Sequence, residues 1–145
     1  MRSALVLIGA LPYLAFALGG GPLWLSQWFR FQCHGRADRT LSWGAQLLPV
    51  CSRCLGIYSG LALAGLLALP RISARARRLW LVSAAAGMVL EVSVQDGTGH
   101  APIHLLRLVT GLLLAWPVAL TLIDAASSPS ADPRNPPAPT EQTPR

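Results

Sequence analysis

Residues 31–58 read FQCHGRADRTLSWGAQLLPVCSRCLGIY and hold all three cysteines of this 145-residue chain. Cys51 and Cys54 are three residues apart and follow Pro49, a residue type favoured at the first position of a helix. A helix that begins there would place both sulfurs on one face of its first turn. The partial positive charge of a helix N-terminus favours thiolate, the reactive and metal-binding form of cysteine. We therefore expect the chemistry of this protein in this stretch.

A Cys-x-x-Cys pair together with a separate Cys-His pair supplies the four donors of a tetrahedral zinc site. The candidate ligands are Cys33, His34, Cys51 and Cys54. Because adjacent residues bind one metal only where the backbone bends, His34 is expected either as the fourth ligand or as a group that orients a ligand. The spacing predicts zinc or another soft transition metal, in a structural or a catalytic role.

Two other interpretations of the cysteines stay open. In a thiol–disulfide oxidoreductase of the membrane, Cys51 would attack, Cys33 would be the resolving partner, and a quinone could accept the electrons. In the plainer interpretation, the cysteines are small buried residues without chemistry. The absence of cysteine from the rest of the chain argues against the plainer interpretation.

The composition predicts an integral membrane protein. Hydrophobic residues make up 52% of the chain and charged residues only 12%, whereas soluble domains are about a quarter charged. The net charge is +6, and all twelve cationic side chains are arginine. We do not expect nucleic acid as a partner, because the arginines of residues 71–78 lie between two apolar segments, where basic residues set topology and meet anionic lipid. The expected partner is the lipid bilayer.

The apolar runs predict an all-α bundle of four transmembrane helices over residues 1–124, because a span needs about 20 residues. The expected spans are about residues 3–25, 50–69, 79–94 and 103–123. A secretory signal peptide is the alternative for the first segment, although its apolar run continues past the cleavage-like residues 15–17. Residues 125–145 are rich in proline and lack apolar periodicity, which predicts a disordered tail.

Small residues repeat every four positions in the second segment, at Gly56, Gly60 and Ala64. This spacing lets helices approach closely in lipid and predicts a helix-packing face. The same face could instead dock a second copy of the chain or another membrane protein. In that third class of function, the protein would be a non-enzymatic subunit or a transporter accessory.

Four spans would bring a second polar group to the side of the cysteines. Its members border the connection between the last two segments: Glu91, Asp96, His100, His104 and Arg107. A carboxylate within a span is costly and is usually paired or functional. Glu91 is therefore expected either in an ion pair with Arg107 or as a proton acceptor beside the metal, and the other four are secondary candidates.

The distribution of arginine predicts the orientation in a bacterial plasma membrane. The side opposite the cysteines carries Arg2, Arg71, Arg75, Arg77 and Arg78 close to the expected spans. By the positive-inside rule, both termini would be cytoplasmic and the Cys/His cluster would face outward. That compartment is oxidising in many bacteria, which favours the redox interpretation.

The cysteine stretch resembles the signature of an uncharacterised (domain-of-unknown-function) family of small prokaryotic membrane proteins. That family reads Cys-His, then Glu-Arg-Ser, then Pro-x-Cys-x-Arg-Cys-x-Gly-Ile-Tyr, and this chain has Cys33-His34, Asp38-Arg39-Thr40 and the last pattern at residues 49–58. A second family block, Asp-Gly-x-x-Gln followed by Asn-x-x-Arg-x-x-x-Gly, is similar to Glu91, Gln95 and His104-x-x-Arg107-x-x-x-Gly111, with His in place of Asn. The resemblance implies a multi-span membrane protein and no particular activity.

Overall fold

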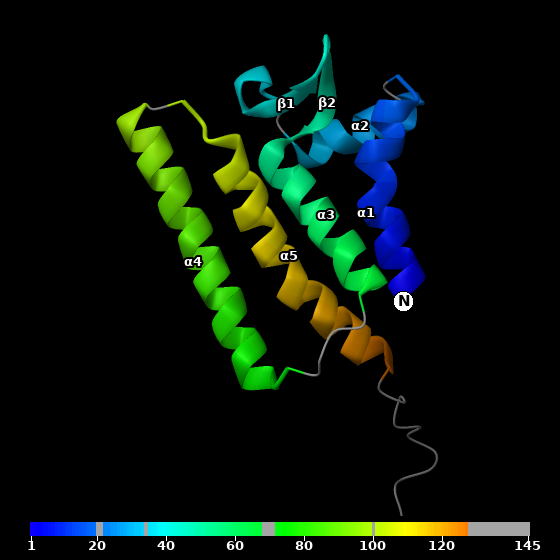
Figure 1. Ribbon diagram of the computed structural model, residues 1–145, viewed down its shortest axis with the longest axis vertical. Coiled ribbons are helices and arrows are strands. Elements are labelled where there is room, and N and C mark those ends of the chain that lie inside the picture. The colour runs from blue at the N-terminus through cyan, green and yellow to red at the C-terminus, as the bar shows by residue number, and fades with distance from the viewer. Residues whose placement is uncertain (20–21, 34, 68–71, 100, 128–145) are drawn as a thin grey trace, which may run out of the picture.

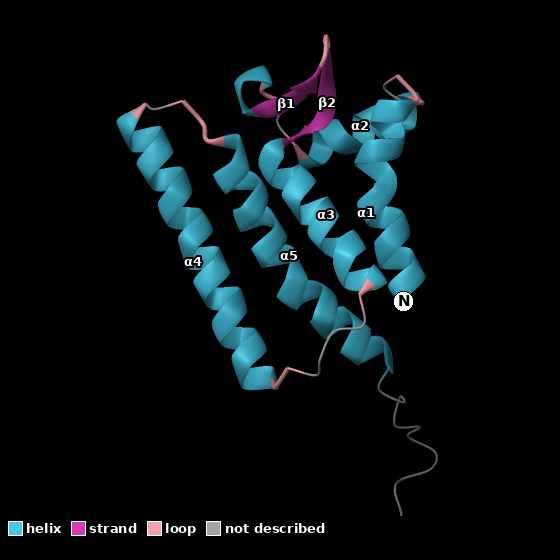
Figure 2. Cartoon of the chain, viewed as in Figure 1, coloured by secondary structure: helices cyan, strands magenta, loops and turns pink. Residues whose placement is uncertain are grey.

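The described part of the chain is mainly helical, as expected, with a small hairpin added. The computed structural model describes residues 1–19, 22–33, 35–67, 72–99 and 101–127. Its elements in chain order are α1 (Arg2–Ala17), α2 (Leu23–Gln32), the 3-10 turn η1 (Ala37–Arg39), β1 (Thr40–Trp43), β2 (Gln46–Cys51), α3 (Ser52–Leu66), α4 (Ala74–Thr98) and α5 (His104–Ser127). Figure 2 shows the two strands at the same end as α2. The predicted tail lies outside the described residues from residue 128 onward.

The four longer helices run alongside one another, with α3 between α1 and α5 (Figure 1). α3 packs against both neighbours, and α4 packs on the outer side of α5, which it contacts less extensively than α3 does. The buried apolar side chains form two clusters. One cluster includes Phe29, Val50 and Leu55 near the hairpin, and the other joins Leu5, Ala64 and Ala119 near the opposite end.

The small-residue face of α3 packs against α5 of the same chain. A Cβ atom added to Gly56 would overlap the carbonyl oxygen of Leu108, and one added to Gly60 would lie 2.9 Å from the Cβ of Ala115. Gly111 of α5 makes the reciprocal approach, because a Cβ there would overlap the carbonyl oxygen of Arg53. Only glycine permits backbones to come this close, which holds the first turns of the two helices together.

The first apolar segment, expected as one span over residues 3–25, contains two helices. α1 ends at Ala17, and Gly19 adopts a φ of 65° in the left-handed region. Pro22 then precedes a second helix, α2, which begins at Leu23. Glycine supplies the backbone reversal and proline starts the new helix without needing its missing N–H, so the Gly-Pro stretch breaks the segment.

α2 is amphipathic. It buries Leu25 and Phe29 against the bundle. Its other side exposes Leu23, Trp24 and Trp28. Tryptophans on the outside of a membrane protein are typical of the level where hydrocarbon meets headgroups.

Residues 40–51, most of which were expected as a loop, form the β1–β2 hairpin. The strands pair antiparallel with Trp43 opposite Gln46 and Thr40 opposite Cys51. Gly44, at φ 63°, occupies the first central position of the two-residue turn, where two-residue hairpins favour glycine. The expectation that Pro49 starts a helix is wrong, because Pro49 lies in β2 and α3 begins at Ser52.

α4 and α5 are longer than the spans expected for them. α4 continues past residue 94, where its span was expected to end, through Thr98, and ends where Gly99 takes a left-handed φ of 65°. α5 extends to Ser127, beyond the expected end at residue 123. The end of α4 differs because a left-handed glycine, rather than the first turn-forming residue, ends the helix.

Within the described ranges, one helix is long and apolar enough to cross a bilayer, namely α5. α1 is apolar but shorter, at 16 residues. α3 has 15 described helical residues, and residues 68–71, where the second expected span ends, are not described. α4 has 25 residues but includes arginines in its first turns and Glu91 within its apolar stretch.

Candidate metal centre

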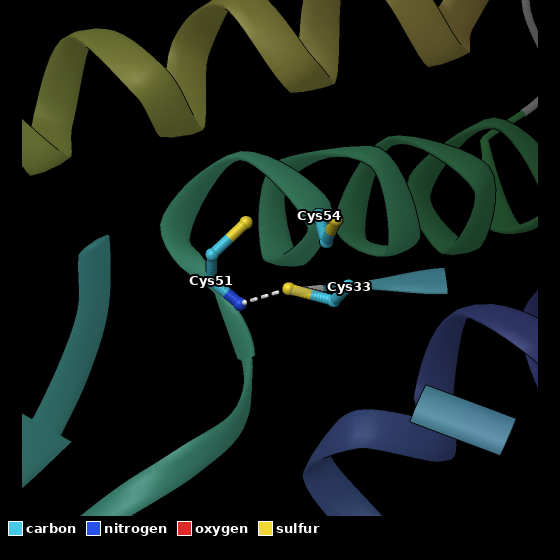
Figure 3. A group of neighbouring side chains, drawn as sticks. All are labelled: Cys33, Cys51 and Cys54. Carbon is cyan, nitrogen blue, oxygen red and sulfur yellow. Dashed lines mark hydrogen bonds between the residues drawn. The ribbon is translucent and has the colours of Figure 1, made fainter. Parts of the chain in front are cut away.

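Three cysteines converge where the hairpin returns to the bundle. Cys33 follows α2, Cys51 ends β2 and caps the N-terminus of α3, and Cys54 lies in the first turn of α3. Their sulfur atoms all lie within 4.8 Å of one another. All three are free thiols. Figure 3 shows the three side chains close to one another at the first turn of α3.

Local hydrogen bonds fix the backbone around this centre. The backbone N–H of Cys51 donates to the Sγ of Cys33 at 3.2 Å (Figure 3). The hydroxyl of Ser52, which is fully buried, donates to the carbonyl of Arg39 at 3.2 Å. The hydroxyl of Thr40 donates to the carbonyl of Arg36 at 2.8 Å. These bonds tie the segment after Cys33 to the start of α3, so the two halves of the cluster keep one geometry.

The environment favours the thiolate of Cys33. Hydrogen bonds from the side chains of Cys51 and Cys54 lower the pKa of Cys33 far below its usual value, and the backbone N–H groups of Gly35 and Cys51 add to the effect. Burial acts in the opposite direction but is outweighed. A thiolate is the form that binds metal ions or attacks disulfides.

A cavity of about 210 Å³ adjoins the three sulfurs. Besides the cysteines, it is lined by Gln32, Gly35, Arg36, Arg39, Arg53 and Arg107. Four arginines therefore line the cavity that the three cysteines share. Opposite charges nearby stabilise thiolate and offset the repulsion that several thiolates would exert on one another.

Glu91 lies in an ion-pair network beside this cavity. Its Oε2 accepts a hydrogen bond from Nη2 of Arg53 at 2.8 Å and another from the hydroxyl of Thr110 at 3.1 Å. Nε of Arg107 lies 3.5 Å from the other carboxylate oxygen. The side chains of Glu91 and Arg107 are only 5% and 2% exposed. The ion pair anticipated for Glu91 is thus present, and its role as a proton acceptor stays a prediction.

Gln95 completes the network and was not recognised as part of a site from residue chemistry. Its Oε1 accepts hydrogen bonds from Nε and Nη2 of Arg107, at 2.9 and 2.6 Å. Glu91 and Gln95 are four residues apart on α4, so they share one helix face. That spacing, with Arg107 on the next helix, is the signal that could have identified the group.

The remaining predicted residues have different outcomes. Nδ1 of His104 lies 3.4 Å from the Ser52 hydroxyl, at the start of α3. Among the described side chains, the group that could hold a metal consists of the three cysteines without His104 or Glu91. His34 and His100 lie outside the described residues. Asp96 lies in α4, and its side chain is not described.

Comparison with known proteins finds a family whose members match the region that contains the three cysteines. Residues 33–121, more than half of the sequence, match a family described as "Predicted membrane protein (DUF2085)". An uncharacterized protein of Methanothermobacter thermautotrophicus is 53% identical over 32 residues, which are 22% of this chain and 29% of that protein. The aligned region is thus less than a third of that relative's length. No solved structure is similar to this chain.

Proposed function

This chain belongs to that family of predicted membrane proteins, and we propose that it binds one soft transition metal ion, zinc, through the three cysteines at one membrane interface. The observation that carries the proposal is the approach of three sulfurs from separate parts of the sequence to within 4.8 Å. Zinc–sulfur bonds of about 2.3 Å in a tetrahedron place sulfurs about 3.8 Å apart. Small side-chain rotations would bring the observed arrangement to that spacing.

The fourth position decides between a structural and a catalytic role. In this proposal His34 provides the fourth donor, because it follows Cys33 directly in sequence. A metal ion with four protein ligands would stabilise the fold. A metal ion whose fourth coordination position is taken by water could activate that water for a reaction. In the second case Glu91, beside the cavity, is the proposed proton acceptor.

The proposal also places α1, α3, α4 and α5 across the bilayer as four spans. Two features support this arrangement beyond the single helix that meets the length and hydropathy requirements. The four helices lie side by side (Figure 1), and each exposes large apolar side chains on its outer surface, for example Leu7, Leu63, Val82 and Leu105. Three charged side chains of these helices, Arg53, Glu91 and Arg107, pair with one another inside the bundle.

The proximity of three free thiols supports a second candidate, a thiol–disulfide oxidoreductase. In such a cycle a disulfide between Cys51 and Cys33 would oxidise two substrate thiols to a disulfide through a mixed disulfide at Cys51, leaving both cysteines as thiols. With the Cys51 thiolate as the attacking group and Cys33 as the resolving thiol, reoxidation of the pair would pass two electrons and two protons to a quinone, which becomes a hydroquinone.

Elemental analysis of protein purified under reducing conditions tests the leading proposal. We expect about one equivalent of zinc per chain, with loss of most of it in Cys51→Ser and Cys54→Ser. Ser83→Ala is the matched control, because Ser83 is on α4 and bonds only within its helix; it should retain the metal. A wild-type protein without metal after expression in zinc-supplemented medium would contradict the proposal.

Thiol trapping in cells separates the two candidates. Rapid alkylation followed by mass spectrometry should find the three cysteines reduced if they hold a metal. A Cys51 disulfide that forms and disappears with the supply of oxidant would instead support the oxidoreductase.

A further inference from the structure

A hydrogen bond beside the cysteine centre joins the two segments that carry Cys33 and Cys54. The hydroxyl of Tyr58 donates to Oε1 of Gln32 at 2.5 Å. Gln32 is the last residue of α2 and directly precedes Cys33. Tyr58 lies on α3, about one helical turn after Cys54. The bond therefore connects parts of the chain that are 26 positions apart in sequence.

The ring of Tyr58 packs against the same turn of α2. Its centroid lies 6.0 Å from that of Phe29, with the ring planes at 81°, the edge-to-face arrangement that aromatic pairs favour. Both side chains are buried. The carbonyl of Phe29 accepts a hydrogen bond from the backbone N–H of Cys33 at 2.8 Å. Tyr58 therefore contacts, through its ring and its hydroxyl, the turn of α2 to which the backbone of Cys33 is bonded.

The position of Cys33 depends on this turn. Cys51 and Cys54 are three residues apart at the start of α3, so the geometry of one helical turn fixes their separation. Cys33 approaches them from the end of α2, 18 positions before Cys51, and is buried there. Where its sulfur lies relative to the other two is therefore decided by how the end of α2 packs on α3, the contact that Tyr58 and Gln32 make.

We propose that Tyr58 and Gln32 are positioning residues, which hold Cys33 beside the other two cysteines before any metal ion is bound. The inference deepens the proposed function, and its metal-binding consequence rests on that function. A ligand that is already in place loses less conformational freedom on binding, so the affinity for the ion is higher. Loss of one hydrogen bond of this kind changes an equilibrium about two- to tenfold.

Alkylation of the metal-free, full-length protein in detergent micelles tests the positioning directly. Cys33 is buried, so iodoacetamide reaches it only when the end of α2 opens. Tyr58→Phe keeps the ring and removes the hydroxyl, and it should speed the alkylation of Cys33, followed by mass spectrometry, about two- to tenfold. Gln32→Leu should do the same by removing the acceptor, and the double variant should be no faster than either single variant.

Tyr13→Phe is the matched control. The hydroxyls of Tyr13 and Ser59 form a hydrogen bond of the same 2.5 Å length between α1 and α3. That bond involves neither α2 nor a cysteine, so its loss should leave the alkylation rate of Cys33 unchanged. Gln32→Glu is the conservative variant, because a carboxylate also accepts from the Tyr58 hydroxyl; it should react as the wild type does.

Cobalt(II), which binds in zinc sites and absorbs light through its bonds to thiolate, gives a second measurement. In anaerobic titrations, the affinity for cobalt should fall about two- to tenfold in Tyr58→Phe and in Gln32→Leu but not in Tyr13→Phe. Alkylation rates in both altered proteins equal to that of the wild type would overturn the inference, as would effects that multiply in the double variant.

The two measurements also separate the inference from the metal function. A wild type that binds no cobalt, but whose Cys33 reacts faster once Tyr58 or Gln32 is changed, would overturn the metal function and support the positioning. Gln32 is exposed, so Gln32→Leu provides the same test where Tyr58→Phe does not fold.

Discussion

Arg53 is the residue at which the cysteine centre and the long helices meet. It lies between Cys51 and Cys54 in sequence, lines their cavity, and pairs with Glu91 on α4 at 2.8 Å. The Arg53 side chain therefore connects the cavity beside the cysteines with Glu91, an acidic residue 38 positions later in the chain. Arg53 neutralises a buried carboxylate and places a positive residue on the wall of the cavity that the cysteines line.

Removal of the carboxylate should destabilise the bundle. Glu91→Gln leaves Arg53 and Arg107 without the acid that both contact, and breaking a buried ion pair costs about 3 kcal/mol or more. Unfolding in mixed detergent micelles, followed by circular dichroism, measures the change. Asp38→Asn is the control, because Asp38 forms an exposed ion pair with Arg36 and should leave the free energy of unfolding unchanged.

Metal content of Glu91→Gln separates two roles for the residue. A folded variant that keeps its zinc would agree with the absence of Glu91 from the thiol group. Equal stability of the variant and the wild type would contradict the network described above.

Chemistry at the residue scale was predictable where sequence spacing is short. The convergence of Cys51 and Cys54 follows from their positions in one turn, and the Glu91–Arg107 pair follows from the cost of an isolated charge in lipid. The approach of Cys33 from 18 positions away depends on the hairpin register, which the sequence does not show. The hydrogen bonds between Gln95 and Arg107 could not be predicted, because they depend on which faces of α4 and α5 meet.

At the scale of elements, the contact between α3 and α5 rests on glycine. Gly56, Gly60 and Gly111 let the two backbones touch. The four-residue spacing on α3 predicted such a face before the partner helix was known. The partner is α5 of the same chain, so this face is already covered within one molecule.

A single added methyl should show how much that contact contributes. Gly56→Ala places a Cβ onto the Leu108 carbonyl, and overpacking of this kind costs about 1–3 kcal/mol. Gly87→Ala is the matched control, because its Cβ meets open space and alanine favours the helix by up to about 1 kcal/mol. Detergent unfolding should therefore move the two variants in opposite directions. A Gly56→Ala protein as stable as the wild type would contradict this account of the α3–α5 contact.

Element boundaries were the least predictable feature. Hydropathy alone joins residues 3–25 into one run, whereas Gly19 and Pro22 divide it into α1 and α2. The hairpin escaped prediction because β1 has only four residues and its alternation is weak. Asp96 and Gly97 are turn-forming types, but the left-handed glycine that ends α4 is Gly99.

At the scale of the whole molecule, both polar connections lie at one end of the bundle. α2, the hairpin, the end of α4 and the start of α5 are together there, and the N-terminus is at the opposite end (Figure 1). The even number of helix crossings expected from hydropathy predicted this juxtaposition. It accounts for how Arg107, which pairs with Glu91, comes to line the same cavity as the cysteines.

Reporter fusions test the proposed orientation. Green fluorescent protein fused after Arg145 should fluoresce, because it folds in the cytoplasm, and alkaline phosphatase inserted after Ala45 in the hairpin turn should be active outside the membrane. The arginines at the N-terminal end of the bundle are the physical reason. The reverse pattern, with an inactive phosphatase at Ala45 and a dark fusion at Arg145, would place the thiols on the cytoplasmic side.

The exposed tryptophans of α2 have a consequence for how a metal ion would reach the thiols. Trp24 and Trp28 would hold this end of the molecule at the depth of the lipid phosphate groups in the surrounding leaflet. Where that leaflet contains acidic lipids, their charge enriches cations in this layer above the bulk concentration. An ion captured by the thiols would therefore be drawn from a reservoir on the membrane surface, and lipid composition would govern how quickly newly made molecules acquire it.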